Sequence, residues 1–268
     1  MLRDPFFKGL RDLRRSFPWW ALGVAILPIW LCLMYPSVKE SSAGIQSYIE
    51  NLPEAFRNMF VGEGADYASP VGFMDSEIMS FMSPILFMVF AIGLAVRQIA
   101  GEEEHGTLSL LLSYPVSRTR LLAQKLGVVF AGVAALTAVH LLSMIAGVAM
   151  VDEMDLGMGK MLAGHVYLGL LTMAVATLAF ALGAATGKRG LSIGVATAVG
   201  AGSYLVNALA PLSDTLKPLQ KVSLFYYYAG AQPLATGLKP GYVAVLLGVT
   251  VVAAATAFVS FARRDVRV

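Results

Sequence analysis

The residues of this chain with the most evident capacity for chemistry are three consecutive glutamates at 102–104 and the histidine after them, His105. Carboxylates beside a histidine could exchange protons or bind a metal ion. The other two histidines, His140 and His165, lie far away in the sequence, and no two histidines have metal-ligand spacing. We therefore expect each histidine to be a buried structural residue and expect no metal on this chain.

Two further kinds of chemistry are excluded by the sequence. The single cysteine, Cys32, lies in an apolar run, so the chain can form neither an intrachain disulfide nor a CxxC site. The chain has no G-x-x-x-x-G-K-[ST] run to cradle the phosphates of a nucleotide. The nearest fragment, 186–189, lacks the upstream glycine and the hydroxyl residue after the lysine, and it predicts a short turn.

The composition indicates where these residues must be placed. Of the 268 residues, 57% are hydrophobic and 14% are charged. So few charges cannot coat a water-soluble globule, which averages about a quarter charged residues. A soluble enzyme, a disordered chain and a disulfide-rich module are therefore excluded. The net charge of +3 comes from residues outside the apolar runs, which indicates membrane topology and no nucleic-acid partner.

Apolar runs of about twenty residues predict membrane-spanning helices. The chain has six of them, and they are too long for transmembrane strands. The predicted fold class is an all-α polytopic membrane protein, with spans at 17–35, 78–100, 126–151, 161–186, 191–212 and 242–262.

The loops predict the orientation of these spans. With the N-terminus inside, fourteen of the twenty Lys and Arg residues fall on the inner side and six on the outer side. Basic residues are retained in cytoplasmic loops. We therefore expect both termini to be cytoplasmic.

Two segments outside the spans have their own patterns. Residues 1–16 place Phe6, Leu10 and Leu13 at helical spacing among cations, which predicts an amphipathic helix that contacts membrane lipid. A plain positively charged anchor is the alternative. Residues 213–241 are too interrupted for a span and carry Phe225, Tyr226, Tyr227 and Tyr228, which predicts a re-entrant or interfacial segment at the outer leaflet.

The inner loop at 101–125 predicts a compact two-helix elbow. The three carboxylates suit a helix N-terminus, where the macrodipole favours anions, and Leu108, Leu111 and Leu112 then share one face. Tyr114 precedes a proline and should end that helix, and Ser117 can cap the next one. A solvated charged loop is the alternative.

This elbow carries a resemblance to a known family. The run E-x-E-x-G-T-L-x-x-L-L-x-x-P-V-S-R from Glu102 to Arg118, with Lys125 seven residues later, resembles the signature of ABC-2-type transporter permeases. The stretch at 52–54, the Gly72-Phe73 pair and the aromatic stretch at 223–228 agree with it over most of the chain.

The resemblance implies a function and partners. Such permeases have six spans in the bacterial cytoplasmic membrane, pair with a second copy or a homologue, and bind separate ATPase subunits that hold ATP and magnesium. The substrate would be a drug, peptide, lipid or envelope precursor, with export more usual than import. The chain itself would not be an enzyme. The residues expected to couple to the ATPase are Glu102, Glu103, Glu104, His105, Gly106, Thr107, Leu108, Leu111, Leu112, Pro115 and Arg118.

Three smaller hypotheses accompany this one. Polar residues within spans are functional candidates, so His140 and Asn207 could line a translocation route or hydrogen-bond a neighbour, which we favour for His140. The aromatic residues at 225–228 could form part of an outer gate. Glycine pairs at 183–187 and 190–194 could hold spans four and five together, although ordinary packing is the simpler interpretation.

Three other classes of protein are weighed against the permease. An ion-coupled secondary transporter usually has inverted repeats and acidic residues deep in its spans, and this chain has neither. An intramembrane enzyme of the glutamate type would need an arginine where Leu108 stands. A purely structural or assembly protein can be separated from a permease only by assay.

Overall fold

The computed structural model describes residues 4–60, 68–113 and 115–265, and in this part of the chain the regular elements are helices without strands. Six helical segments are long and apolar enough to cross a membrane, which confirms the all-α polytopic fold. They are α2 (Phe17–Glu40), the composite helix Pro70–Glu104, α9 (Arg118–Ala149), α10 (Met158–Thr186), α11 (Arg189–Leu209) with its extension to Leu212, and α14 (Pro240–Arg263).

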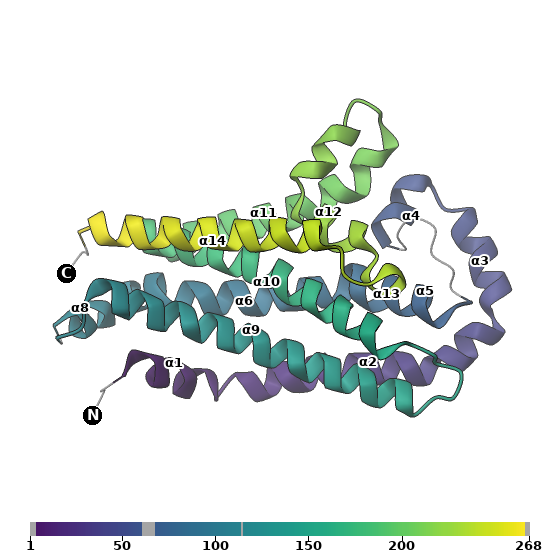
Figure 1. Cartoon of the computed structure of the whole chain (residues 1–268), viewed down its shortest axis with the longest axis horizontal. Coiled ribbons are helices and arrows are strands. Elements are labelled where there is room, and N and C mark those ends of the chain that lie inside the picture. Colours follow the sequence, from purple (N-terminus) through teal and green to yellow (C-terminus); the bar gives the residue numbers. More distant parts are fainter. Residues whose placement is uncertain (1–3, 61–67, 114, 266–268) are drawn as a thin grey trace.

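Helix α10 lies at the centre of the bundle (Figure 1) and is the most buried span. It contacts α6, α9, α11 and α14, while α2 packs along α9 on the periphery. Small residues allow this close approach of helix backbones within a membrane. Gly164, Gly169 and Gly183 of α10 all lie within 4 Å of another helix or its side chains, measured from the position of an added Cβ.

The second span is one continuous helix with two wider turns. It begins with α5 (Pro70–Met74) and passes through π-helix η1 (Asp75–Met82), α6 (Ser83–Val96) and π-helix η2 (Arg97–Gly101) to α7 (Glu102–Glu104). Pro84 in the first turn of α6 cannot donate a backbone hydrogen bond, which is consistent with the wider turn before it.

Several helices extend beyond the predicted ends of their spans. The second span begins at Pro70 and α9 begins at Arg118, each eight residues before the predicted start. The predicted span 17–35 continues as a helix through Pro36 to Glu40, and the predicted span 78–100 continues to Glu104. An apolar run reports where lipid contact stops, whereas helical hydrogen bonds continue into the polar region. A proline removes only one backbone donor and can be accommodated within a helix of a membrane protein.

The two ends of the bundle have different structures. Helix α1 (Pro5–Leu13), helix α8 (Thr107–Leu112) and the C-terminal end of α14 lie together at one end, here called the elbow end (Figure 1). At the other end, α3 (Ser42–Glu50) and α4 (Glu54–Phe60) form a pair of short helices with Pro53 between them.

The segment between the fifth and sixth spans forms a helical hairpin near this second end (Figure 1). It contains η4 (Lys217–Val222), α12 (Leu224–Tyr228), η5 (Ala229–Ala231) and α13 (Pro233–Thr236). We call this end of the bundle the hairpin end.

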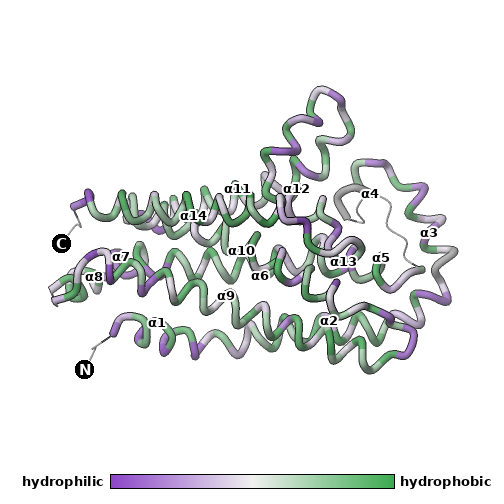
Figure 2. Tube along the Cα trace, viewed as in Figure 1, coloured by the Kyte–Doolittle hydropathy of each residue, from purple (hydrophilic) through white to green (hydrophobic). Residues whose placement is uncertain are grey.

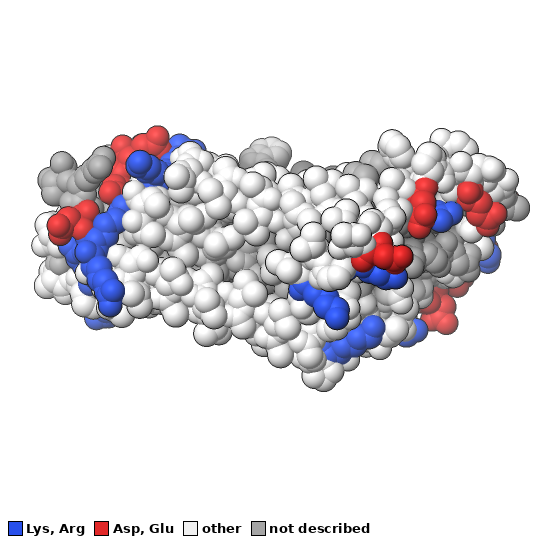
Figure 3. Space-filling view, turned by 90° about the horizontal axis from the view of Figure 1, so that it is seen from above, with Lys and Arg blue, Asp and Glu red and all other residues white. Residues whose placement is uncertain are grey.

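The distribution of hydrophobic and hydrophilic residues distinguishes the six spans from the two ends of the bundle. The tube is mostly hydrophobic along the six spans and hydrophilic at the two ends (Figure 2). On the face drawn in Figure 3, charged side chains gather toward both ends and leave a broad uncharged region between them. An uncharged band flanked by charged ends is the surface that a bilayer requires.

Candidate functional site

The elbow is built differently from the sequence prediction. The three glutamates form α7, which closes the helix of the second span, and do not begin the helix that carries the leucines. The chain reverses at Gly106, whose φ of +69° is left-handed, and α8 follows from Thr107 to Leu112. An added Cβ on Gly106 would meet no atom within 4 Å, so a close backbone approach does not explain this glycine. Its conformation does, because residues other than glycine rarely adopt it.

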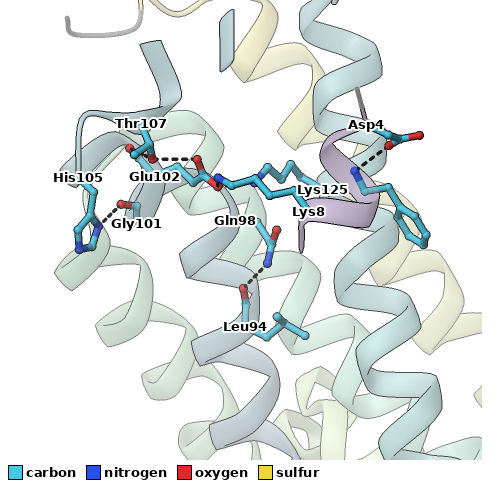
Figure 4. Close-up of polar contacts among 10 residues, drawn as sticks. Asp4, Lys8, Leu94, Gln98, Gly101, Glu102, His105, Thr107 and Lys125 are labelled. Atoms are coloured by element: carbon cyan, nitrogen blue, oxygen red, sulfur yellow. Dashed lines mark hydrogen bonds and ion pairs between the residues drawn. The ribbon is translucent and has the colours of Figure 1, made fainter. Parts of the chain in front are cut away.

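Acidic residues at a helix C-terminus oppose the macrodipole, and cations from other helices offset this. Glu102 Oε1 accepts hydrogen bonds from Lys8 Nζ of α1 at 2.9 Å and from Lys125 Nζ of α9 at 2.6 Å (Figure 4). Its other oxygen, Oε2, accepts from Thr107 Oγ1 at 2.9 Å. The Lys125 side chain is only 2% exposed, so this is a buried ion pair that joins three elements.

The other two glutamates attach the elbow to later helices. Glu103 pairs with Arg264 at the end of α14, and the two side chains lie directly over Gly187, which ends α10 with a left-handed φ of +65°. Glu104 pairs with Arg189 at the start of α11 at 3.3 Å. The elbow is thereby bound to four other helices.

Arg118 closes the same arrangement from α9. Its Nη1 atom donates to the backbone oxygen of Arg264 at 2.6 Å, and its guanidinium lies 6.0 Å from the centre of the Phe261 ring. Ser117 caps α9 as predicted, because its Oγ accepts from the Arg120 backbone N–H at 3.2 Å. Tyr114 lies outside the described residues. The second helix of the predicted elbow is the first part of α9, which continues unbroken into the third span.

The predicted apolar face of the elbow faces inward. Leu108 and Leu111 are buried in the core of this chain, and Leu112 packs against that core. Leu108 and Leu111 therefore offer no exposed surface to a partner in this chain, whereas Leu112 is half-buried. Leu110 instead is 64% exposed at the tip of the elbow. No sequence pattern singled out Leu110, because a two-turn helix with four leucines has no clear apolar face.

The histidines divide into two cases. His105 is exposed, with Nδ1 2.6 Å from the Gly101 oxygen, so the prediction that it is buried is wrong. His140 and His165 are buried, and His140 Nδ1 lies 2.8 Å from His165 Nε2. His140 Nε2 also lies 2.8 Å from Ser83 Oγ. His140 thus hydrogen-bonds its neighbours within the bundle, which is the role favoured for it from the sequence. Among the described residues, no group of three or more His, Cys, Asp and Glu could hold a metal ion.

The outer candidates also have partners within the chain. Gln220 Nε2 donates to the backbone and side-chain oxygens of Asn207 at 3.2 and 3.3 Å, which attaches the hairpin to α11. Phe225 and Tyr228 are buried, and Tyr228 donates to the Met79 oxygen. Tyr226 and Tyr227 are only half-buried and contact the Tyr242 ring. Of the four aromatic residues proposed for an outer gate, these two are the more exposed, and the gate itself stays a prediction.

The helix pairing also creates an apolar groove that no sequence pattern indicated. It lies between α6 and α11, has a volume of about 370 Å³, and is lined by residues that include Met88, Ile92, Thr197 and Tyr204.

The glycines of the two predicted pairs differ in their surroundings. Gly183 packs against Ala100, whereas Gly190 and Gly194 have open space around them.

A family model described as ABC-2 family transporter protein matches residues 6–266, which is nearly the entire chain. No curated protein matches the chain significantly.

Proposed function

We propose that this chain, which belongs to the ABC-2 family of transporter proteins, is the permease subunit of an exporter. The exporter would be powered by ATPase subunits on separate polypeptides. The match of the family model over residues 6–266 carries this proposal. The six spans supply the membrane path, and the sequence contains no phosphate-cradling loop of its own. The location that follows is a bacterial cytoplasmic membrane.

The elbow is the element that would transmit ATPase movement to the spans. Its exposed surface includes Glu104, His105 and Leu110. Beside it lies a hollow of about 440 Å³ between the glutamates and the turn at Lys188 and Arg189. Because α7 continues the second span and ion pairs join it to other helices, a displacement here moves several spans together.

The translocation route would lie where two permease subunits face one another. Helix α11 exposes Gly190, Gly194 and Ala198 at successive turns, and the apolar groove against α6 lies on the same helix. Small residues at this spacing allow a second helix to approach closely within a membrane. A second copy, or a homologue, packed on α11 would enclose the groove.

The energy source provides the direct test. Purified alone, the chain is expected to hydrolyse no ATP, because it lacks a phosphate-binding loop. Co-expressed with its ATPase subunit, it is expected to co-purify with that subunit as a complex that hydrolyses ATP. Hydrolysis by the isolated chain would contradict the proposal. Substrate movement without any ATPase would favour an ion-coupled transporter, and cleavage of a substrate without transport would favour an intramembrane enzyme.

Orientation is tested with single cysteines. In a Cys32→Ala background, we expect a membrane-impermeant maleimide to label Thr215→Cys in intact cells and Ser113→Cys only after lysis. Both side chains are exposed, one on the hairpin and one on the elbow. The reason is the excess of Lys and Arg on the elbow side of the spans. Labelling of position 113 in intact cells would reverse the orientation.

A further inference from the structure

A second cavity lies beside the elbow, on the side of α1. It has a volume of about 320 Å³ and is walled by Gly9, Asp12 and Leu13 of α1 and by residues at the end of the second span. Its base is apolar, because Leu13 and Leu94 are both buried. The cavity therefore joins an apolar floor to a polar rim at the level of the amphipathic helix.

The rim is shaped by the π-helix η2. This wider turn, Arg97–Gly101, presents both Arg97 and Gln98 to the cavity, whereas two consecutive residues of an α-helix point about 100° apart. Such turns often occur at functional sites. The guanidinium of Arg97 has no hydrogen-bond or ion-pair partner among the described residues. Arginine is suited to bind a planar or tetrahedral oxyanion with two parallel N–H bonds.

The local charges leave one positive charge unbalanced. Glu102 accepts from both Lys8 and Lys125, so one carboxylate serves two ammonium groups. Arg189, also on the rim, is balanced by Glu104. Asp12 of α1 also lines the cavity and offsets one of the two remaining cations. The single surplus charge matches a monoanion.

We propose that this cavity binds the phosphate diester of an anionic inner-leaflet phospholipid, with Arg97 holding the phosphate and Leu13 and Leu94 contacting the apolar part. The amphipathic α1 places the cavity at headgroup depth, which favours a lipid phosphate over a free one. Asp12 limits the site to one negative charge. The assignment does not depend on the proposed transport function.

The first test removes the arginine. Wild-type protein and Arg97→Gln are released from nanodiscs of phosphatidylcholine with a minority of phosphatidylglycerol, and retained lipid is counted by native mass spectrometry. We expect Arg97→Gln to weaken phosphatidylglycerol retention about tenfold, the effect of one charge-assisted hydrogen bond. Arg120→Gln is the matched control, because Arg120 is an exposed cation of the same end outside the cavity, and it should retain phosphatidylglycerol normally.

The second test should increase binding, which misfolding could not mimic. Asp12→Asn removes the opposing carboxylate and is expected to strengthen phosphatidylglycerol retention severalfold, whereas Asp265→Asn, an equal charge change near the C-terminus, should not. Equal effects of each variant and its control would indicate diffuse attraction and overturn the site.

A third test uses inorganic phosphate. Added to protein in phosphatidylcholine nanodiscs, it should neither bind nor raise the thermal midpoint of unfolding. Arg97-dependent binding of inorganic phosphate without phosphatidylglycerol retention would overturn the lipid assignment.

Discussion

Replacing Leu110 with aspartate is expected to weaken association with the ATPase subunit at least about tenfold while the permease remains folded. Leu110 is the exposed apolar side chain at the tip of the elbow, and it lies outside the ion pairs that hold the elbow together. A large apolar residue that becomes buried in a partner is typical of the residues that dominate binding energy, and a carboxylate there would be buried unpaired. The measurement is the dissociation constant of the purified ATPase for the permease in nanodiscs.

Leu219→Asp is the matched control for this prediction. Leu219 is an exposed leucine on the hairpin, at the opposite end of the bundle from the elbow. The control variant should bind the ATPase as the wild type does. If Leu110→Asp also binds normally and keeps full ATP-driven transport, the outer surface of the elbow is not where the ATPase docks.

The second large effect is expected on stability, from Glu102→Gln. The change leaves Lys125 almost fully buried without its counter-ion, and breaking a buried pair in this way costs about 3–5 kcal/mol. Because Lys8 loses the same partner, α1 should also detach more readily from α9. The free energy of unfolding, measured by denaturant titration in mixed micelles, should fall by that amount.

Two further variants test whether the loss of stability comes from the buried ion pair. Glu104→Gln breaks the exposed pair with Arg189, and exposed pairs contribute only about 0–1 kcal/mol. The double variant Glu102→Gln with Lys125→Met should recover most of the lost stability, because it removes the buried charge together with its partner. If Glu102→Gln is as stable as Glu104→Gln, the buried pair does not hold the elbow.

Glu102 and Glu103 indicate how a network of ion pairs within the chain could serve coupling. Glu102 and Glu103 have side chains that are only 11% and 10% exposed, and both are bound within the chain. They would act by positioning the elbow, and only the exposed residues around them could touch an ATPase. The hypothesis that all the elbow residues couple to the ATPase therefore divides into a positioning set and a contact set.

The sequence by itself determined the features that depend on local physics. The length of each apolar run predicts a span because a helix must cross a fixed thickness of hydrocarbon. Ser117 predicts the start of α9, because capping acts within one turn. The spacing of glycine, lysine and hydroxyl residues in the sequence likewise shows that the chain has no phosphate-binding loop.

Only the tertiary structure decided which groups meet. The cations that pair with the three glutamates come from 94, 23, 161 and 85 residues away along the chain. A local rule placed these acids at a helix N-terminus, but that preference is worth only about 0.3–1 kcal/mol, and ion pairs made in three dimensions outweigh it. His140 and His165, 25 residues apart in the sequence, likewise meet only because α9 and α10 pack against each other. Whether Leu108 or Leu110 faces the core depends on where neighbouring helices pack around a helix of six residues, and no periodicity in so short a segment carries that information.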